Sequence, residues 1–213
     1  MFMIVGRDKI TQEMLTDWQQ HWEENKNNSH MLGEYIAKRI QIKNGKALEH
    51  VKTIIGYHFK NFQMQFAGHQ RQYDAHSLHM DETGTDRKHM TYTLLVPLSH
   101  DKRIKTVIFN EPANTNQEIQ NRIMEYGKTT SPLPIKSNVG ETELAHTSRH
   151  WQHGQYFADT LELKGMFEYK VGDYVIFDTN LIHSSNNWKK IDRWKDNYKE
   201  IIQAHFEDID TLI

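Results

Sequence analysis

The sequence of 213 residues contains no cysteine. A chain without thiols can form no disulfide bond, no thiolate metal site and no iron–sulfur cluster, so any metal must be held by nitrogen and oxygen ligands. The same sequence contains 14 histidines. The histidines are therefore the first place to look for a metal site.

Long hydrophobic runs and a strong net charge are also lacking. No apolar run approaches the roughly 18 residues of a membrane span, and the run Met1 to Val5 is too short for the apolar region of a secretory signal. These absences predict a soluble, cytoplasmic protein with no membrane partner. The formal net charge is −2, from 26 basic and 28 acidic residues. This balance argues against a nucleic-acid substrate, which usually requires a basic stripe.

Residues 1–61 are predicted to be helical and to support the rest of the chain. A first helix opens at Thr11. A second begins near Met31, where apolar residues recur at a spacing of three to four. A third spans Ala47 to Phe59.

Residues 62–213 are predicted to form an antiparallel β core within a single domain of residues 1–213. Short runs rich in β-branched and aromatic residues alternate with Gly, Asn, Asp and Pro, which is typical of a closed two-sheet roll. An insertion at about 111–154 interrupts the pattern and contains a helix from Asn116 to Tyr126. The candidate strands are Gln63–Phe66, Tyr73–Met80, Met90–Leu98, Thr106–Asn110, Leu161–Phe167, Tyr174–Asp178 and Glu200–Phe206.

One short motif can supply two metal ligands. His79 and Asp81 are two positions apart at the end of a strand-like run, so strand alternation places both side chains on one face. His76, three positions before His79, is expected to face the other side. A His-x-Asp pair alone is a weak signal, because such pairs occur by chance in histidine-rich chains.

A second motif lies far downstream. A Gly172-Asp173 turn starts the apolar run that ends at Asp178, and the strand after the next turn presents His183. If this strand lies beside His79, two histidines and one carboxylate share one face of a metal ion. That facial triad leaves open positions and suits iron(II) oxygen chemistry.

Together, the two motifs resemble those of the non-haem iron(II)/2-oxoglutarate-dependent dioxygenase superfamily, over about Tyr73 to Phe206. The resemblance implies a double-stranded β-helix, or jelly-roll, packed by N-terminal α-helices, with His79, Asp81 and His183 as ligands of Fe(II). It also implies 2-oxoglutarate as cosubstrate and dioxygen as reactant. The implied reaction couples decarboxylation of 2-oxoglutarate to succinate with oxidation of a C–H bond, most commonly as a hydroxylation.

The family also needs a basic residue for the distal carboxylate of 2-oxoglutarate. Arg193 stands ten positions after His183, and Arg193-Trp194 resembles the Lys-Trp pair of prolyl hydroxylases. Strand alignment makes Lys199 the alternative. Tyr73 resembles the tyrosine that often shares this carboxylate in the family, although a half-buried strand tyrosine is an equally good interpretation.

Two other functions remain open. A cupin-like metal enzyme that does not use 2-oxoglutarate would add a ligand such as His76 and give Arg193 no role. A non-catalytic β-roll binding module would be favoured if Asp81 and His183 proved too far apart to share an ion. The substrate, whether a small molecule or a peptidyl side chain, is not identified by any motif.

Overall fold

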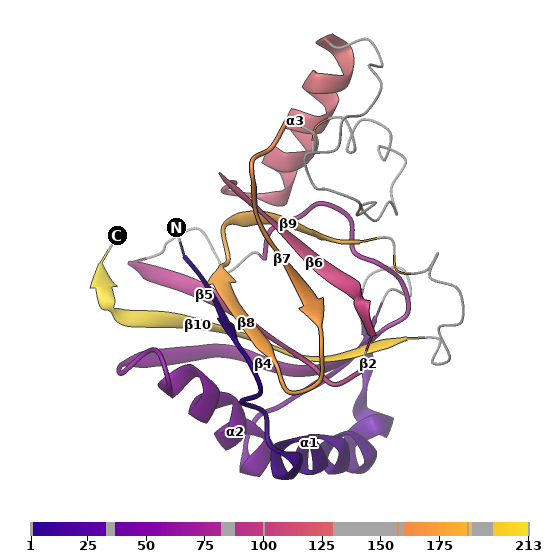
Figure 1. The fold of residues 1–213 in the computed structure, drawn as a ribbon, viewed down its shortest axis with the longest axis vertical. Coiled ribbons are helices and arrows are strands. Elements are labelled where there is room, and N and C mark those ends of the chain that lie inside the picture. The colour runs from indigo at the N-terminus through magenta and orange to yellow at the C-terminus, as the bar shows by residue number, and fades with distance from the viewer. Residues whose placement is uncertain are drawn as a thin grey trace.

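The computed structural model describes residues 2–32, 37–81, 88–99, 101–129, 157, 160–186, 188 and 198–212. Two antiparallel sheets form its centre (Figure 1). Across the larger sheet the order is β1 (Met3–Gly6), β8 (Tyr174–Asp178), β5 (His89–Pro97), β10 (Lys199–Leu212), β4 (Phe62–Gln72), β3 (Ala37–Gln41) and β2 (His30–Leu32). The smaller sheet has the order β7 (Leu163–Tyr169), β6 (Asp101–Pro112) and β9 (Leu181–Ser185).

The two sheets pack face to face around a shared apolar core. Leu95, Val175 and Ile201 of the larger sheet belong to one buried cluster with Ile108 and Phe167 of the smaller sheet. Side chains alternate across a strand, so each sheet gives one face to this core. The arrangement is a jelly-roll, which confirms the predicted fold class.

Two helices cover the outer face of the larger sheet, as Figure 1 shows: α1 (Gln12–Asn25) and α2 (Gly45–Gly56). The hydroxyl of Thr11 accepts a hydrogen bond from the backbone N of Met14, 3.2 Å away, and so caps α1. Trp18 is fully buried among apolar side chains of α2 and the sheet. The first and third predicted helices are therefore confirmed. A short 3-10 turn, η1 (Lys26–Asn28), follows α1.

The second predicted helix is wrong. The chain from His30 to Gln41 contains β2 and β3, and β3 pairs with β4. Ala37 and Ile40 are buried in β3, and their three-residue spacing imitates a helical stripe. Pairing with a long neighbouring strand outweighs the local periodicity. The sequence also gave no signal for β1, which pairs with β8 at the edge of the sheet.

The predicted strand Tyr73–Met80 is also wrong. Regular pairing of β4 ends at Gln72, and the segment up to Asp81 is irregular apart from one bridge between His79 and His183. The other predicted strands correspond to β4, β5, β6, β7, β8 and β10.

The helix predicted within 111–154 is α3 (Asn116–Thr129); β6 extends into the start of that range, and residues 130–154 lie outside the described residues. In the described part of the chain, no helix has the length and apolarity needed to cross a membrane.

Candidate metal centre and adjoining cavity

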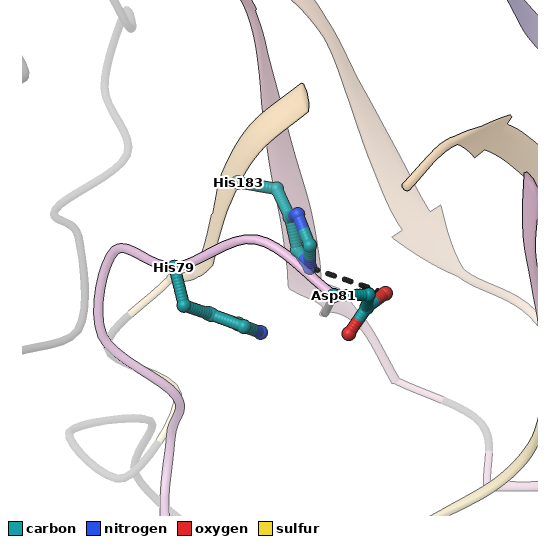
Figure 2. A group of neighbouring side chains, drawn as sticks. All are labelled: His79, Asp81 and His183. Atoms are coloured by element: carbon teal, nitrogen blue, oxygen red, sulfur yellow. Dashed lines mark ion pairs between the residues drawn. The ribbon is translucent and has the colours of Figure 1, made fainter. Parts of the chain in front are cut away.

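Three side chains converge where the segment after β4 meets β9. His79 and His183 exchange backbone hydrogen bonds of 2.9 and 2.8 Å, which brings their imidazole centroids to 4.2 Å. Asp81 follows two residues later, and its Oδ2 lies 3.7 Å from Nε2 of His183 (Figure 2). One ligand atom from each of the three residues lies within 4.8 Å of the other two. The set can hold one metal ion.

Backbone carbonyls fix the tautomer of both imidazoles. Nδ1 of His79 lies 2.6 Å from the carbonyl oxygen of Ser77, and Nδ1 of His183 lies 2.9 Å from that of Leu181. A carbonyl oxygen only accepts, so each Nδ1 must carry the hydrogen. In the neutral ring, Nε2 then presents a lone pair, as metal-binding histidines require.

Both rings are held in the neutral form. Burial and the neighbouring His183 imidazole lower the pKa of His79 to about 4. Burial likewise lowers the pKa of His183. Burial alone would raise the pKa of Asp81, but His183, His205, His79 and the Thr93 hydroxyl together lower it below its usual range. Two neutral imidazoles and one carboxylate are therefore available at neutral pH.

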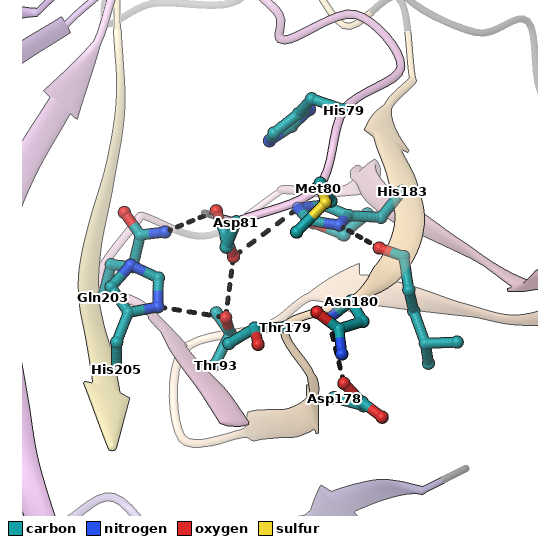
Figure 3. A network of polar contacts seen from close by, with 12 residues as sticks. His79, Met80, Asp81, Thr93, Asp178, Thr179, Asn180, His183, Gln203 and His205 are labelled. Carbon is teal, nitrogen blue, oxygen red and sulfur yellow. Dashed lines mark hydrogen bonds and ion pairs between the residues drawn. The ribbon is translucent and has the colours of Figure 1, made fainter. Parts of the chain in front are cut away.

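Hydrogen bonds from the larger sheet orient the carboxylate (Figure 3). Oγ1 of Thr93 donates to Oδ2 of Asp81 at 2.7 Å, and Nε2 of Gln203 donates to Oδ1 at 3.3 Å. Nδ1 of His205 lies 3.1 Å from the Thr93 hydroxyl. Since that hydroxyl gives its hydrogen to Asp81, it accepts from His205.

A cavity of about 380 Å³ opens beside the three side chains, between the two sheets. Lys199 of β10 lines its wall and is only 2% exposed. Its Nζ donates to Oγ of Ser185 at 3.1 Å and lies 3.4 Å from the hydroxyl oxygen of Tyr169. No carboxylate of the described residues pairs with this ammonium, and burial lowers the pKa of Lys199 to about 7. A buried cation therefore faces the same cavity as the triad.

Comparison with known proteins identifies the fold. The chain is similar to the non-haem alpha-ketoglutarate-dependent carbocyclase SnoK from nogalamycin biosynthesis, with a TM-score of 0.59 and 10% identity over 97% of this chain and 79% of that one. It is also similar to HygX from Streptomyces hygroscopicus, solved with nickel and 2-oxoglutarate bound (TM-score 0.55, 8% identity, 97% of this chain and 82% of that one). A Pseudomonas putida prolyl-4-hydroxylase matches with a TM-score of 0.50 and 8% identity over 97% of this chain and 91% of that one.

The chain has the fold of the iron/2-oxoglutarate-dependent oxygenases. At the level of sequence, no family model and no curated protein matches the chain.

Within the oxygenase fold, the predicted site residues fall into three groups. His79, Asp81, His183 and Lys199 surround one cavity. Tyr73 is half-buried and packs against Tyr198, with ring centroids 5.8 Å apart, and is not among the described residues that line the cavity. Arg193 lies outside the described residues.

Other cavity residues were not predicted. His76 was expected on the opposite face, but the irregular segment turns it into the cavity wall, so this expectation is wrong. Burial, with a contribution from His79, lowers the pKa of His76 to about 3. Tyr169 and Ser185, which contact Lys199, lie on strands of the smaller sheet. Their sequence gives no signal, because only the closure of the two sheets brings them to β10.

Proposed function

We propose that this protein is an iron(II)- and 2-oxoglutarate-dependent oxygenase that hydroxylates a small-molecule or peptidyl substrate with dioxygen. One observation carries the proposal. A single cavity joins a converging set of two neutral imidazoles and a carboxylate to a buried lysine that has no acidic partner among the described residues. That combination suits a ligand that chelates a metal at one end and carries a negative charge at the other.

The donor set fits the metal. Two imidazoles and one carboxylate on one face, with other coordination positions open, are typical of non-haem iron(II) oxygenases. His79 and His183 would bind through Nε2, and Asp81 through a carboxylate oxygen. Bound iron(II) would supply the activation of dioxygen that couples decarboxylation of 2-oxoglutarate to oxidation of a C–H bond.

The chain's own groups orient this centre. The carbonyls of Ser77 and Leu181 hold the two rings, and the hydroxyl of Thr93 with the amide of Gln203 holds Asp81. Such outer partners fix ligand orientation and raise ligand basicity. No rearrangement of the described side chains is then needed for the three ligands to converge.

We assign the distal carboxylate of 2-oxoglutarate to Lys199. An ammonium buried without a carboxylate gains most from an anion, because neutral hydroxyl partners offset only part of its desolvation until the anion binds. The hydroxyls of Ser185 and Tyr169 lie beside it and can each donate to the same carboxylate. The alternative that Arg193 binds this carboxylate stays a prediction, and the binding measurement described below tests it.

The decisive experiment measures succinate. The protein is loaded with iron(II) under anaerobic conditions, 2-oxoglutarate is added, air is admitted, and succinate is quantified. Iron-dependent succinate formation is expected in the wild type and in Asp210→Ala, an exposed control, and should be lost in Asp81→Ala and His183→Ala. Unchanged succinate formation in either ligand variant would refute the assignment of the metal ligands.

A second measurement is needed because the protein can form succinate too slowly to detect when the substrate to be oxidised is absent. Binding of 2-oxoglutarate to the metal-loaded protein is followed by calorimetry. Lys199→Met should weaken it by about 30-fold or more, since removing one partner of a desolvated charge pair costs several kcal/mol. If Arg193→Met has this effect and Lys199→Met does not, Arg193 is the anchor. If neither iron nor 2-oxoglutarate binds, the cupin-like or non-catalytic alternatives are favoured.

A further inference from the structure

A second cation lines the same cavity, and the proposed function does not use it. Arg39 is half-buried on β3, and its guanidinium carbon lies 4.5 Å from the centroid of the Phe66 ring. Burial lowers the pKa of Arg39, the charge of Asp81 opposes that shift in part, and the guanidinium stays charged. No carboxylate of the described residues forms an ion pair with it. Stacking on Phe66 holds the plane of its donors in place.

A row of amide side chains runs across the larger sheet from Asp81 to Arg39. Ionised Asp81 can only accept, so Gln203 must turn its NH₂ group toward it. The carbonyl oxygen of Gln203 then faces Gln70 and accepts from the NH₂ group of Gln70. The carbonyl oxygen of Gln70 accepts in turn from Nε2 of Gln72 at 3.2 Å. The carboxylate of Asp81 thus sets the direction of the whole row.

With the amides oriented in this way, the guanidinium of Arg39 faces a hydrogen-bond donor of Gln70 instead of an acceptor. The end of the Gln70 amide that contacts Gln203 lies 3.2 Å from Nη2 and 3.3 Å from Nε of Arg39. With the row set by Asp81, that end is an NH₂ group, and a guanidinium has no acceptor of its own. Reversing Gln70 would give Arg39 an acceptor but would place two carbonyl oxygens together at Gln203. Asp81 and Arg39 therefore cannot both be satisfied by the row, and an acceptor in the cavity resolves the conflict.

We propose that Arg39 binds a carboxylate of the substrate that is oxidised. This inference rests on the proposed function, which assigns the other cation, Lys199, to 2-oxoglutarate. The planar fork of a guanidinium matches a carboxylate through two parallel hydrogen bonds. A cavity of about 380 Å³ lies near the lower end of the roughly 300–1,000 Å³ usual for small-molecule sites. The substrate class is therefore a small carboxylic acid, whose other polar groups can bond to the amides of Gln72 and Gln203.

The test uses acetate as the simplest carboxylate probe. The protein is loaded with zinc(II), which is diamagnetic and accepts the same ligand types, and with 2-oxoglutarate so that Lys199 is occupied. The ¹⁵N–¹H signal of the Arg39 Nε group, assigned by its absence in Arg39→Gln, is followed as acetate is added. Arg71 supplies an internal control, because its Nε already donates to Glu200 at 2.8 Å.

A saturable shift of the Arg39 signal with acetate is expected, while the Arg71 signal stays in place. Acetamide should bind at least about tenfold more weakly, because it lacks the charge that strengthens these hydrogen bonds. No saturable shift, an equal response to acetamide, or tighter binding of inorganic phosphate would overturn the proposal.

The same samples separate this inference from the proposed function. Retention of 2-oxoglutarate is read from the broadening of its own proton signals. If 2-oxoglutarate fails to bind while Arg39 responds to acetate, the proposed function fails and the Arg39 site stands. If 2-oxoglutarate binds and Arg39 does not respond, only the present inference fails.

Discussion

Lys199→Met is expected to make the protein more stable while it weakens the binding of 2-oxoglutarate. In the unfolded chain a lysine has its ordinary pKa of 10.5, whereas burial lowers the pKa of Lys199 to about 7 in the folded protein. Between these values the unfolded state binds more protons, so the free energy of unfolding rises with pH across this window. Below pH 7 the folded state carries the whole cost of the buried charge.

The size of this cost follows from the two pKa values. A difference from 10.5 to about 7 corresponds to about 5 kcal/mol at low pH, at 1.36 kcal/mol for each pH unit. Methionine keeps most of the apolar stem, so the variant loses little packing. Allowing for the hydrogen bond to Ser185, we expect a gain of about 2–4 kcal/mol at pH 6. For a chain of this size that gain raises Tm by roughly 4–16 °C.

The assay is chemical and thermal denaturation of metal-free protein without 2-oxoglutarate, at several values between pH 6 and 10. The stability advantage of Lys199→Met over the wild type should shrink toward pH 10. Lys38→Met is the matched control, because Lys38 is exposed on β3. If Lys199→Met is instead less stable by a similar amount at every pH, Lys199 is a structural group held by Ser185 and Tyr169, and the reasoning about an anion site is refuted.

Two further changes test the supports of the site. Thr93→Val removes the hydrogen bond to Asp81 and should weaken metal binding about 10- to 100-fold, measured by calorimetry with manganese(II). Thr91→Val, on the same strand, is the control and should leave the metal affinity unchanged. Equal affinities of the two variants would show that Thr93 does not position the carboxylate. Trp18→Ala removes a fully buried ring whose Nε1 donates to the carbonyl oxygen of Ala47. It should lower the free energy of unfolding, measured by urea denaturation, by about 3–5 kcal/mol. A decrease below about 1 kcal/mol would mean that packing of Trp18 does not hold α1 on the sheet.

The three converging side chains could be predicted because their signals are local. His79-x-Asp81 is a two-residue spacing, and the turn before β8 is marked by Gly172, whose φ of +105° favours glycine. The physical reason for the convergence differed from the expectation, however. His79 and Asp81 do not alternate along a regular strand; a single bridge to His183 sets their positions.

The remaining wall of the cavity could not be predicted for a physical reason. Arg39 on β3 is paired with Gln70 on the neighbouring strand β4, and Gln70 is paired with Ile201 on β10. The row of amides therefore depends on strand pairing between distant parts of the chain. The apolar periodicity around Arg39 is moreover typical of a helix, and a helix would not place the Arg39 side chain beside Gln70. Register between strands is set by the whole sheet and leaves little trace in one short segment.

Charge pairing distinguishes the cations of the cavity from those that support the fold. Buried Asp173 pairs with Arg7 at 2.6 Å, and Arg71 and His69 both contact Glu200. These groups have partners within the chain because an unpaired charge is costly to bury. Lys199 and Arg39 form no ion pair with a carboxylate of the described residues, and both line the cavity that also holds the triad. We therefore propose that their burial, which the chain offsets only in part, favours the binding of two anionic ligands, the cosubstrate at Lys199 and the substrate at Arg39.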